Sequence, residues 1–229
     1  YSPSLESASV LEKTRVPLLL LDTTMDYDFG AAVAPERISY NHGIHGVQDL
    51  ASVLRRRNRR FEIVAGHVSQ SDVLNRAAQI ARAAHAANRL RGMRVLRIGE
   101  SFRGMGDFAV PAGVLEERFG IAVETAPLDR LAGEMSNVTE SEIREEILRD
   151  ADRYQIEASG DVHRRTVGVS LALRHLLEQA SCGACSMNFL AFDTAQPPVN
   201  VVPFLEASKA MERGLGYAGE GDVLTACLV

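Results

Sequence analysis

Several features that would assign a function class at once are scarce in this chain. Its 229 residues contain three cysteines, an odd number too small for a disulfide framework. The net charge is −5, which gives no general attraction to nucleic acid or to anionic membranes. The apolar run at residues 18–21 is far too short to span a bilayer. We find no signal-peptide pattern and expect a cytoplasmic protein without nucleic-acid or membrane partners.

The loop that follows the expected strand at residues 94–98 is not a nucleotide-binding fingerprint, because G-x-G-x-x-G is absent from it. The loop that follows residue 98 instead carries Glu100, Arg103 and Asp107 among small residues. Carboxylates repel phosphate, so a polyol ligand suits this loop better. The structural alternative is that Arg103 simply forms an ion pair with Glu100 or Asp107.

Short apolar runs alternate with amphipathic segments, a pattern typical of parallel sheets covered by helices. We therefore predict an α/β fold with doubly wound (Rossmann/flavodoxin-like) parallel sheets and helices on both faces, in two domains. The boundary is expected at Gly92, which gives domains of residues 1–92 and 93–229. Expected strands are residues 16–21, 61–64, 94–98, 121–124 and 187–192. Expected helices are residues 71–91, 112–119, a helix after the capping box of Thr139 and Glu142, and one through residues 169–180; residues 126–137 show no periodicity.

The segment His42-Gly43-Ile44-His45 places two imidazoles next to glycines before an apolar helical pattern. Glycine permits backbone conformations closed to other residues, so both histidines are expected to project from a turn ahead of the helix. Such a loop suits a binding site. Ordinary turn histidines are the equally weighted alternative.

Two further motifs allow a functional and a structural interpretation. In the segment from Tyr217 to Asp222, Glu220 and Asp222 precede a helix, and acids there commonly act as caps. Cys182 and Cys185 form a C-x-x-C motif, but a zinc site needs two more ligands. We interpret the cysteines as small residues in a turn between a helix and a strand, with redox chemistry as a distant alternative.

Four segments resemble the L-arabinose isomerase and L-fucose isomerase superfamily. They are the histidine loop, the strand leading to His67, the Arg97-Ile-Gly-Glu-Ser-Phe-Arg-Gly-Met segment, and Gly-Tyr-Ala-Gly-Glu-Gly-Asp ending at Asp222. The resemblance covers the chain from near residue 17 to residue 229. The last block is the most specific. His42 stands where authentic arabinose isomerases typically carry glutamine, so the resemblance does not fix the sugar.

The resemblance implies an aldose–ketose isomerase that moves a proton between C1 and C2 of a pentose or deoxyhexose, with Mn²⁺ or another divalent cation. It makes Glu220 a catalytic residue and a metal ligand. It also implies contacts with the sugar from His45, His42, Phe102 and Tyr217. The two histidines would reach the sugar in the active site of a neighbouring subunit, so the resemblance implies a homo-oligomer.

By the same resemblance, a start before residue 1 and most of the catalytic region after residue 229 are expected to be absent. The chain alone is therefore expected to be inactive. The alternative function is a non-catalytic sugar sensor built from two doubly wound domains.

Overall fold

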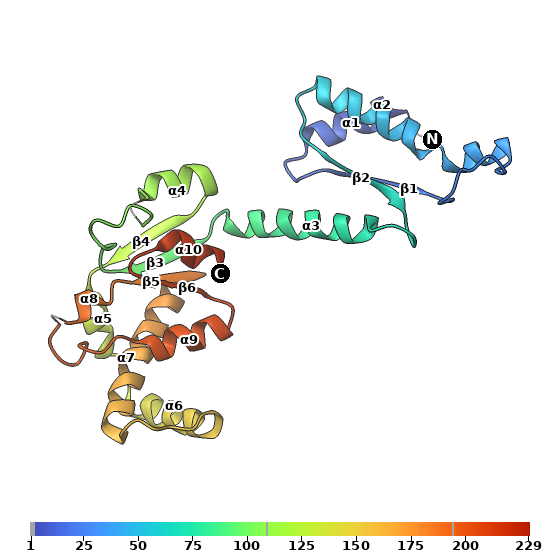
Figure 1. The fold of residues 1–229 in the computed structure, drawn as a ribbon. Helices are drawn as coiled ribbons and strands as arrows, with labels where there is room; N and C mark the ends of the chain where they lie inside the picture. The colour runs from blue at the N-terminus through green and yellow to red at the C-terminus, as the bar shows by residue number, and fades with distance from the viewer. Residues whose placement is uncertain (1–2, 109, 194) are drawn as a thin grey trace. The chain divides into compact units, whose positions relative to one another are not determined.

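The computed structural model describes residues 3–108, 110–193 and 195–229 of the chain. The chain divides into two compact units, Tyr1–Asn88 and Arg89–Val229, which we call the N-terminal and C-terminal units. Each unit combines parallel strands with helices, as Figure 1 shows. The predicted α/β class with parallel sheets is confirmed. The division falls inside the long helix α3 (Val73–Leu90), a few residues before the glycine at which we placed the boundary.

The N-terminal unit contains two parallel strands, β1 (Leu19–Thr24) and β2 (Glu62–His67), paired in register from Leu19 opposite Glu62. Both strands extend about three residues further along the chain than the apolar runs at 16–21 and 61–64 indicated. Helix α2 (Gly43–Arg56) packs against β1 and against α1 (Ser4–Lys13). The remaining elements of this unit are the 3₁₀ helix η1 (Pro35–Asn41) and most of α3.

The C-terminal unit has one four-stranded parallel sheet in the order β4-β3-β5-β6. The predicted strand at residues 94–98 is confirmed as β3, and the run at 121–124 becomes β4, shifted by one to two residues. The four strands are β3 (Arg94–Ile98), β4 (Ala122–Ala126), β5 (Ala184–Met187) and β6 (Gly216–Gly219).

The strand predicted at residues 187–192 is wrong, because β5 ends at Met187 and a short helix, α8 (Leu190–Asp193), follows. The side chain of Asn188 accepts a hydrogen bond from the backbone N–H of Leu190 at 3.1 Å. A side chain that bonds the backbone two residues on favours a turn over a continued strand. Strand β6 was also missed, since its glycines indicated a turn.

Helices cover both faces of this sheet (Figure 1), as predicted. Successive strand residues alternate between the faces. Val95 packs with α4 (Ala112–Phe119) and α10 (Val223–Leu228), whereas Leu96 packs with α5 (Leu128–Met135), α7 (Gly160–Gln179) and α9 (Phe204–Glu212). Residues 126–137, which showed no periodicity, contain α5. The unit also contains α6 (Glu140–Arg153).

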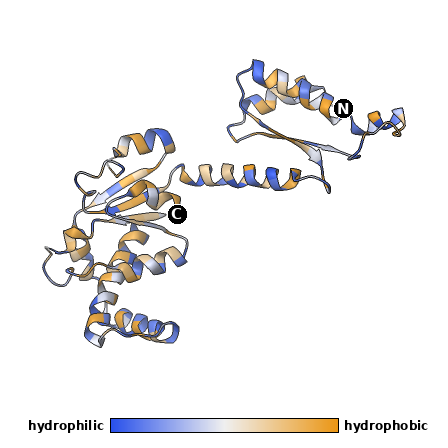
Figure 2. Cartoon of the chain, viewed as in Figure 1, coloured by the Kyte–Doolittle hydropathy of each residue, from blue (hydrophilic) through white to orange (hydrophobic). Residues whose placement is uncertain are grey.

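Helix α6 begins at the predicted capping box. The Thr139 hydroxyl accepts the Glu142 N–H at 3.2 Å, and the Glu142 carboxylate accepts the Thr139 N–H at 2.7 Å. Nine of its fourteen residues are charged, and the hydrophilic colour runs along it in Figure 2. Apolar burial alone therefore does not hold α6 in place.

The strand order sets the place where a ligand is expected. From β3 the chain proceeds to β4 on one side, and it then returns to β5 on the other side of β3. In open parallel sheets, ligands bind beyond the carboxyl ends of strands at such a reversal. Across the described ranges, no helix is both long and apolar enough to cross a membrane.

Candidate functional site

A hollow of about 310 Å³ opens at the carboxyl edge of the C-terminal sheet. Four aromatic rings and two carboxylates gather there, together with strand β6. This composition, apolar walls with a few polar groups, is typical of small-molecule sites. Its lining residues are Phe108, Phe189, Phe204, Tyr217, Ala218, Gly219, Glu220 and Asp222.

Glu220 occupies an unusual backbone position in this hollow. Its φ is +65°, in the left-handed region that non-glycine residues seldom adopt, and Gly221 follows at +85°. The Glu220 carboxylate makes no hydrogen bond or ion pair with any residue the structure describes. Its neighbour Asp222 accepts the Thr225 N–H at 3.0 Å and caps α10. The cap interpretation is therefore confirmed for Asp222, and Glu220 is left without a capping role.

The structure brings Phe102 and Tyr217 to the same place as Glu220. The Phe102 N–H donates to the Glu220 carbonyl at 3.0 Å, and its ring packs edge-on against Phe189 with centroids 5.0 Å apart. The Tyr217 hydroxyl is buried and has no partner in the described part of the chain. Burial raises the pKa of Tyr217 to about 12, so the hydroxyl stays protonated and can donate.

His42 and His45 lie in the N-terminal unit, at the start of α2. Their rings are 3.9 Å apart and tilted by 34°, and both side chains are exposed. His42 is the N-cap residue, but His45 is already in the first helical turn, so the prediction that both precede the helix is wrong for His45. The helix begins at Gly43, where an added Cβ would lie 2.6 Å from an Asp22 carboxylate oxygen. Glycine is needed here for close packing.

The sequence patterns did not indicate three aromatic residues that line the hollow, Phe108, Phe189 and Phe204. Phe189 lies two residues past β5, and a correct end for that strand would have pointed to it. Phe204 begins α9, a helix that the sequence pattern did not indicate.

The structural alternative, an ion pair of Arg103 with Glu100 or Asp107, is wrong, because neither pair forms among the residues that the structure describes. The Glu100 carboxylate accepts from Arg97 at 3.0 Å, a residue inside β3 that we had treated only as part of a strand. The Arg97 side chain is 17% exposed and also donates to the Ser101 hydroxyl, in the loop after β3, at 3.0 Å.

Cys182 and Cys185 are both buried free thiols, and Cys185 lies within β5 rather than in a turn. Burial raises the pKa of the Cys185 thiol to about 12. A reactive cysteine needs the opposite shift and an accessible sulfur. The structure therefore favours a packing role for this pair.

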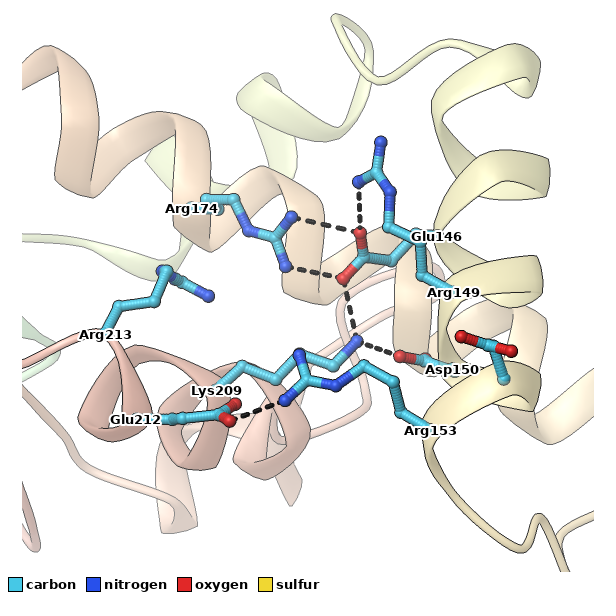
Figure 3. A pocket seen from close by; sticks show the side chains of 9 residues that line it. Glu146, Arg149, Asp150, Arg153, Arg174, Lys209, Glu212 and Arg213 are labelled. Carbon is cyan, nitrogen blue, oxygen red and sulfur yellow. Dashed lines mark hydrogen bonds and ion pairs between the residues drawn. The ribbon is translucent and has the colours of Figure 1, made fainter.

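A second hollow, of about 230 Å³, lies among α6, α7 and α9 and has a different character (Figure 3). Arg174 forms two hydrogen bonds with the Glu146 carboxylate, at 2.7 and 3.1 Å. The Lys209 ammonium donates to Glu146 at 2.7 Å and to Asp150. The opposite side of Asp150 binds the His163 ring at 2.9 Å. None of this cluster was predicted, because its members lie far apart in the sequence.

Each buried carboxylate of this cluster is bound by at least one basic side chain. Glu146 is 3% exposed, and its hydrogen bonds with Arg174, followed by those with Lys209, outweigh burial and lower its pKa to about 2. Glu206 is fully buried and bound by Arg174 and Arg213. Burial opposes the charge on Arg174, but its two carboxylate partners together raise its pKa. We interpret the cluster as the attachment of α6 to α7 and α9.

The described residues do not form a metal centre. Among residues 3–108, 110–193 and 195–229, no group of three or more His, Cys, Asp or Glu side chains could hold a metal ion. At the first hollow, Glu220 and the capping Asp222 are the carboxylates at hand. One free carboxylate does not fit a complete divalent site.

Comparison with known proteins gives the family. A model described as the L-arabinose isomerase central domain matches residues 94–229, which include all of the C-terminal sheet. The whole chain is 29% identical to an L-arabinose isomerase of Nocardioides sp. and 27% identical to that of Herpetosiphon aurantiacus. It is 30% identical to that of Acidothermus cellulolyticus. In each case the chain spans 46% of the relative's length. This chain belongs to the L-arabinose isomerase family.

Proposed function

We propose that the protein carrying this chain is an aldose–ketose isomerase acting on a pentose or deoxyhexose such as L-arabinose or L-fucose. One observation carries the proposal: Glu220, whose carboxylate has no partner among the described residues, lies at an aromatic-walled hollow on the carboxyl edge of the sheet. The relatives named L-arabinose isomerase support the reaction class.

The reaction moves hydrogen between C1 and C2 of the sugar through an enediol, and it leaves the overall composition of the sugar unchanged. A carboxylate that is not neutralised by an ion pair can take up and return a proton. In our proposal Glu220 supplies this group. The rings of Phe102, Phe189 and Tyr217 contact the C–H face of the sugar.

We further propose Mn²⁺ or another divalent cation as cofactor, with Glu220 as one ligand. A bound divalent cation would polarise the sugar carbonyl as a Lewis acid. Because the described residues offer no group of three ligands, the remaining ligands must come from other segments, and the chain by itself is expected to be inactive.

His45 and His42 are proposed as sugar-contacting groups that act in a neighbouring subunit of a homo-oligomer. The support is their position on an exposed helix start, where neither ring is covered by its own unit. His45→Ala should then raise the apparent KM for the sugar without unfolding the protein.

The decisive experiment compares Glu220→Gln with the wild type in the full-length protein, with Mn²⁺ and a panel of aldoses, by measuring ketose formation. We expect turnover to fall by at least about 100-fold, the range attributed to removing an acid–base group. Glu178→Gln, an exposed change on α7, is the matched control and should keep full activity.

Full activity in Glu220→Gln would remove Glu220 from the mechanism. Tight sugar binding by the wild type without metal and without ketose formation would instead favour the sugar-sensor function.

A further inference from the structure

The turn that carries Glu220 is held by a loop from another strand. The Ser101 hydroxyl donates to the Gly221 carbonyl at 2.9 Å, and the Phe102 N–H donates to the Glu220 carbonyl at 3.0 Å. Strands β3 and β6, which precede these two segments, are separated in the sheet by β5. The loop after β3 therefore reaches over β5 to hold the turn after β6.

The junction is close enough to restrict the turn. A Cβ built on Gly221 would lie 2.4 Å from the Ser101 Cα, so the two backbones touch there. Glu220 adopts its left-handed φ of +65° beside this contact. Left-handed backbone costs a non-glycine residue about 1–2 kcal/mol, so surrounding contacts must stabilise it.

Arg97 fixes the direction in which Ser101 donates. Its guanidinium donates to the Ser101 hydroxyl oxygen at 3.0 Å and to the Thr125 hydroxyl at 3.0 Å, and it pairs with Glu100. Arginine has only donors, so Ser101 must accept from it. The single hydrogen of the Ser101 hydroxyl is then free to go to the Gly221 carbonyl.

We infer that Arg97 and Ser101 are positioning residues, which set the Glu220 carboxylate at the hollow by fixing the turn on its far side. The two residues do not line the hollow and are not proposed to touch sugar. The inference rests on the proposed role of Glu220 in isomerisation.

The test uses Ser101→Ala, with Ser101→Thr as the conservative variant that keeps the hydroxyl. Ser208→Ala is the matched control, because its hydroxyl also donates to a carbonyl, that of Phe204 within α9, at 3.1 Å. In the full-length protein, Ser101→Ala should lower kcat about fivefold, the effect of one hydroxyl hydrogen bond, with the sugar KM unchanged. Ser101→Thr should restore kcat, and Ser208→Ala should not alter it.

A second readout does not depend on activity. Amide hydrogen exchange of Phe102, measured by NMR on this chain, should become about fivefold faster in Ser101→Ala and stay unchanged in Ser208→Ala. Unchanged exchange in Ser101→Ala would overturn the fixing of the turn. Faster exchange with unchanged kcat would overturn the positioning role. If the wild type converts no aldose, the proposed function fails, and the exchange result still decides whether Ser101 fixes the turn.

Discussion

Two carboxylates of the C-terminal unit, Glu146 and Glu220, occupy opposite surroundings. Glu146 is buried among Arg174, Lys209 and Arg149, and its pKa falls to about 2. Glu220 is half-buried at an aromatic-walled hollow, and its carboxylate has no charged partner in the described ranges. The cluster around Glu146 contains many more charged residues, yet it is the less suitable place for chemistry.

The two carboxylates differ in whether their charge is already paired with basic side chains. A carboxylate bound by two or three cations gains little from a ligand and must lose hydrogen bonds to react. An unpaired carboxylate next to apolar walls keeps its acceptor atoms for a ligand. The number of charges around a hollow is therefore a poor guide to function, and the pairing of those charges is a better one.

The largest effect should come from breaking the paired region. Arg174→Met removes the cation shared by Glu146 and Glu206, and it should lower the free energy of unfolding by about 3–5 kcal/mol, as expected when one partner of a buried ion pair is lost. Urea unfolding followed by circular dichroism measures this. Arg165→Met, an exposed change on the same helix, is the control and should alter stability by less than about 0.5 kcal/mol. Equal effects of the two variants would contradict the attachment role of the cluster.

The second largest effect should be a loss of folding stability in acid, caused by protonation of Glu146. The folded-state pKa of Glu146 is depressed from its ordinary 4.5 to about 2, so its contribution is complete above pH 4.5 and is lost as the pH falls toward 2. The linkage amounts to about 2–3 kcal/mol over that window. Unfolding measured from pH 6 to pH 2 should show this decline, and Glu146→Gln should flatten it. An unchanged slope in that variant would assign the acid sensitivity to other groups.

The smallest effect on stability should come from removing buried serine hydroxyls, and it should depend on whether the hydroxyl has a hydrogen-bond partner. Ser170 and Ser186 are both fully buried, but the Ser170 hydroxyl has no partner among the described residues, whereas that of Ser186 donates to the Gly219 carbonyl at 3.2 Å. Ser170→Ala should be neutral or stabilising by up to about 1 kcal/mol. Ser186→Ala should cost about 1 kcal/mol. Thermal unfolding of both variants provides the comparison, and the reverse order would contradict it.

Local patterns predicted the parts of the fold that depend on neighbouring residues. The capping box of Thr139, the strand at Arg94–Ile98 and the helix at Ala112–Phe119 are all confirmed within a residue. Predictions failed where a single side chain redirects the backbone, as Asn188 does after β5, and where glycines in β6 concealed a strand.

The candidate site was predictable only in part. Glu220, Phe102 and Tyr217 were named from a family resemblance, and the structure brings these three together, while His42 and His45 lie in the other unit. Phe189 was missed because the end of the preceding strand was misplaced. Arg97 and Ser101 lie in a segment that resembles the family, but an arginine in a strand and a serine in a loop are ordinary, so neither residue was given a role.

The sequence by itself determined the α/β class, the starts of α4 and α6, and the unusual Gly-Glu-Gly turn, because these follow from periodicity, capping and glycine over a few residues. Only the tertiary structure decided which carboxylates are paired. Arg174, Glu146 and Glu206 meet across three helices, and Ser101 meets Gly221 across 120 residues of chain. Coulombic and hydrogen-bond energies depend on distances in space, and sequence spacing does not report those distances.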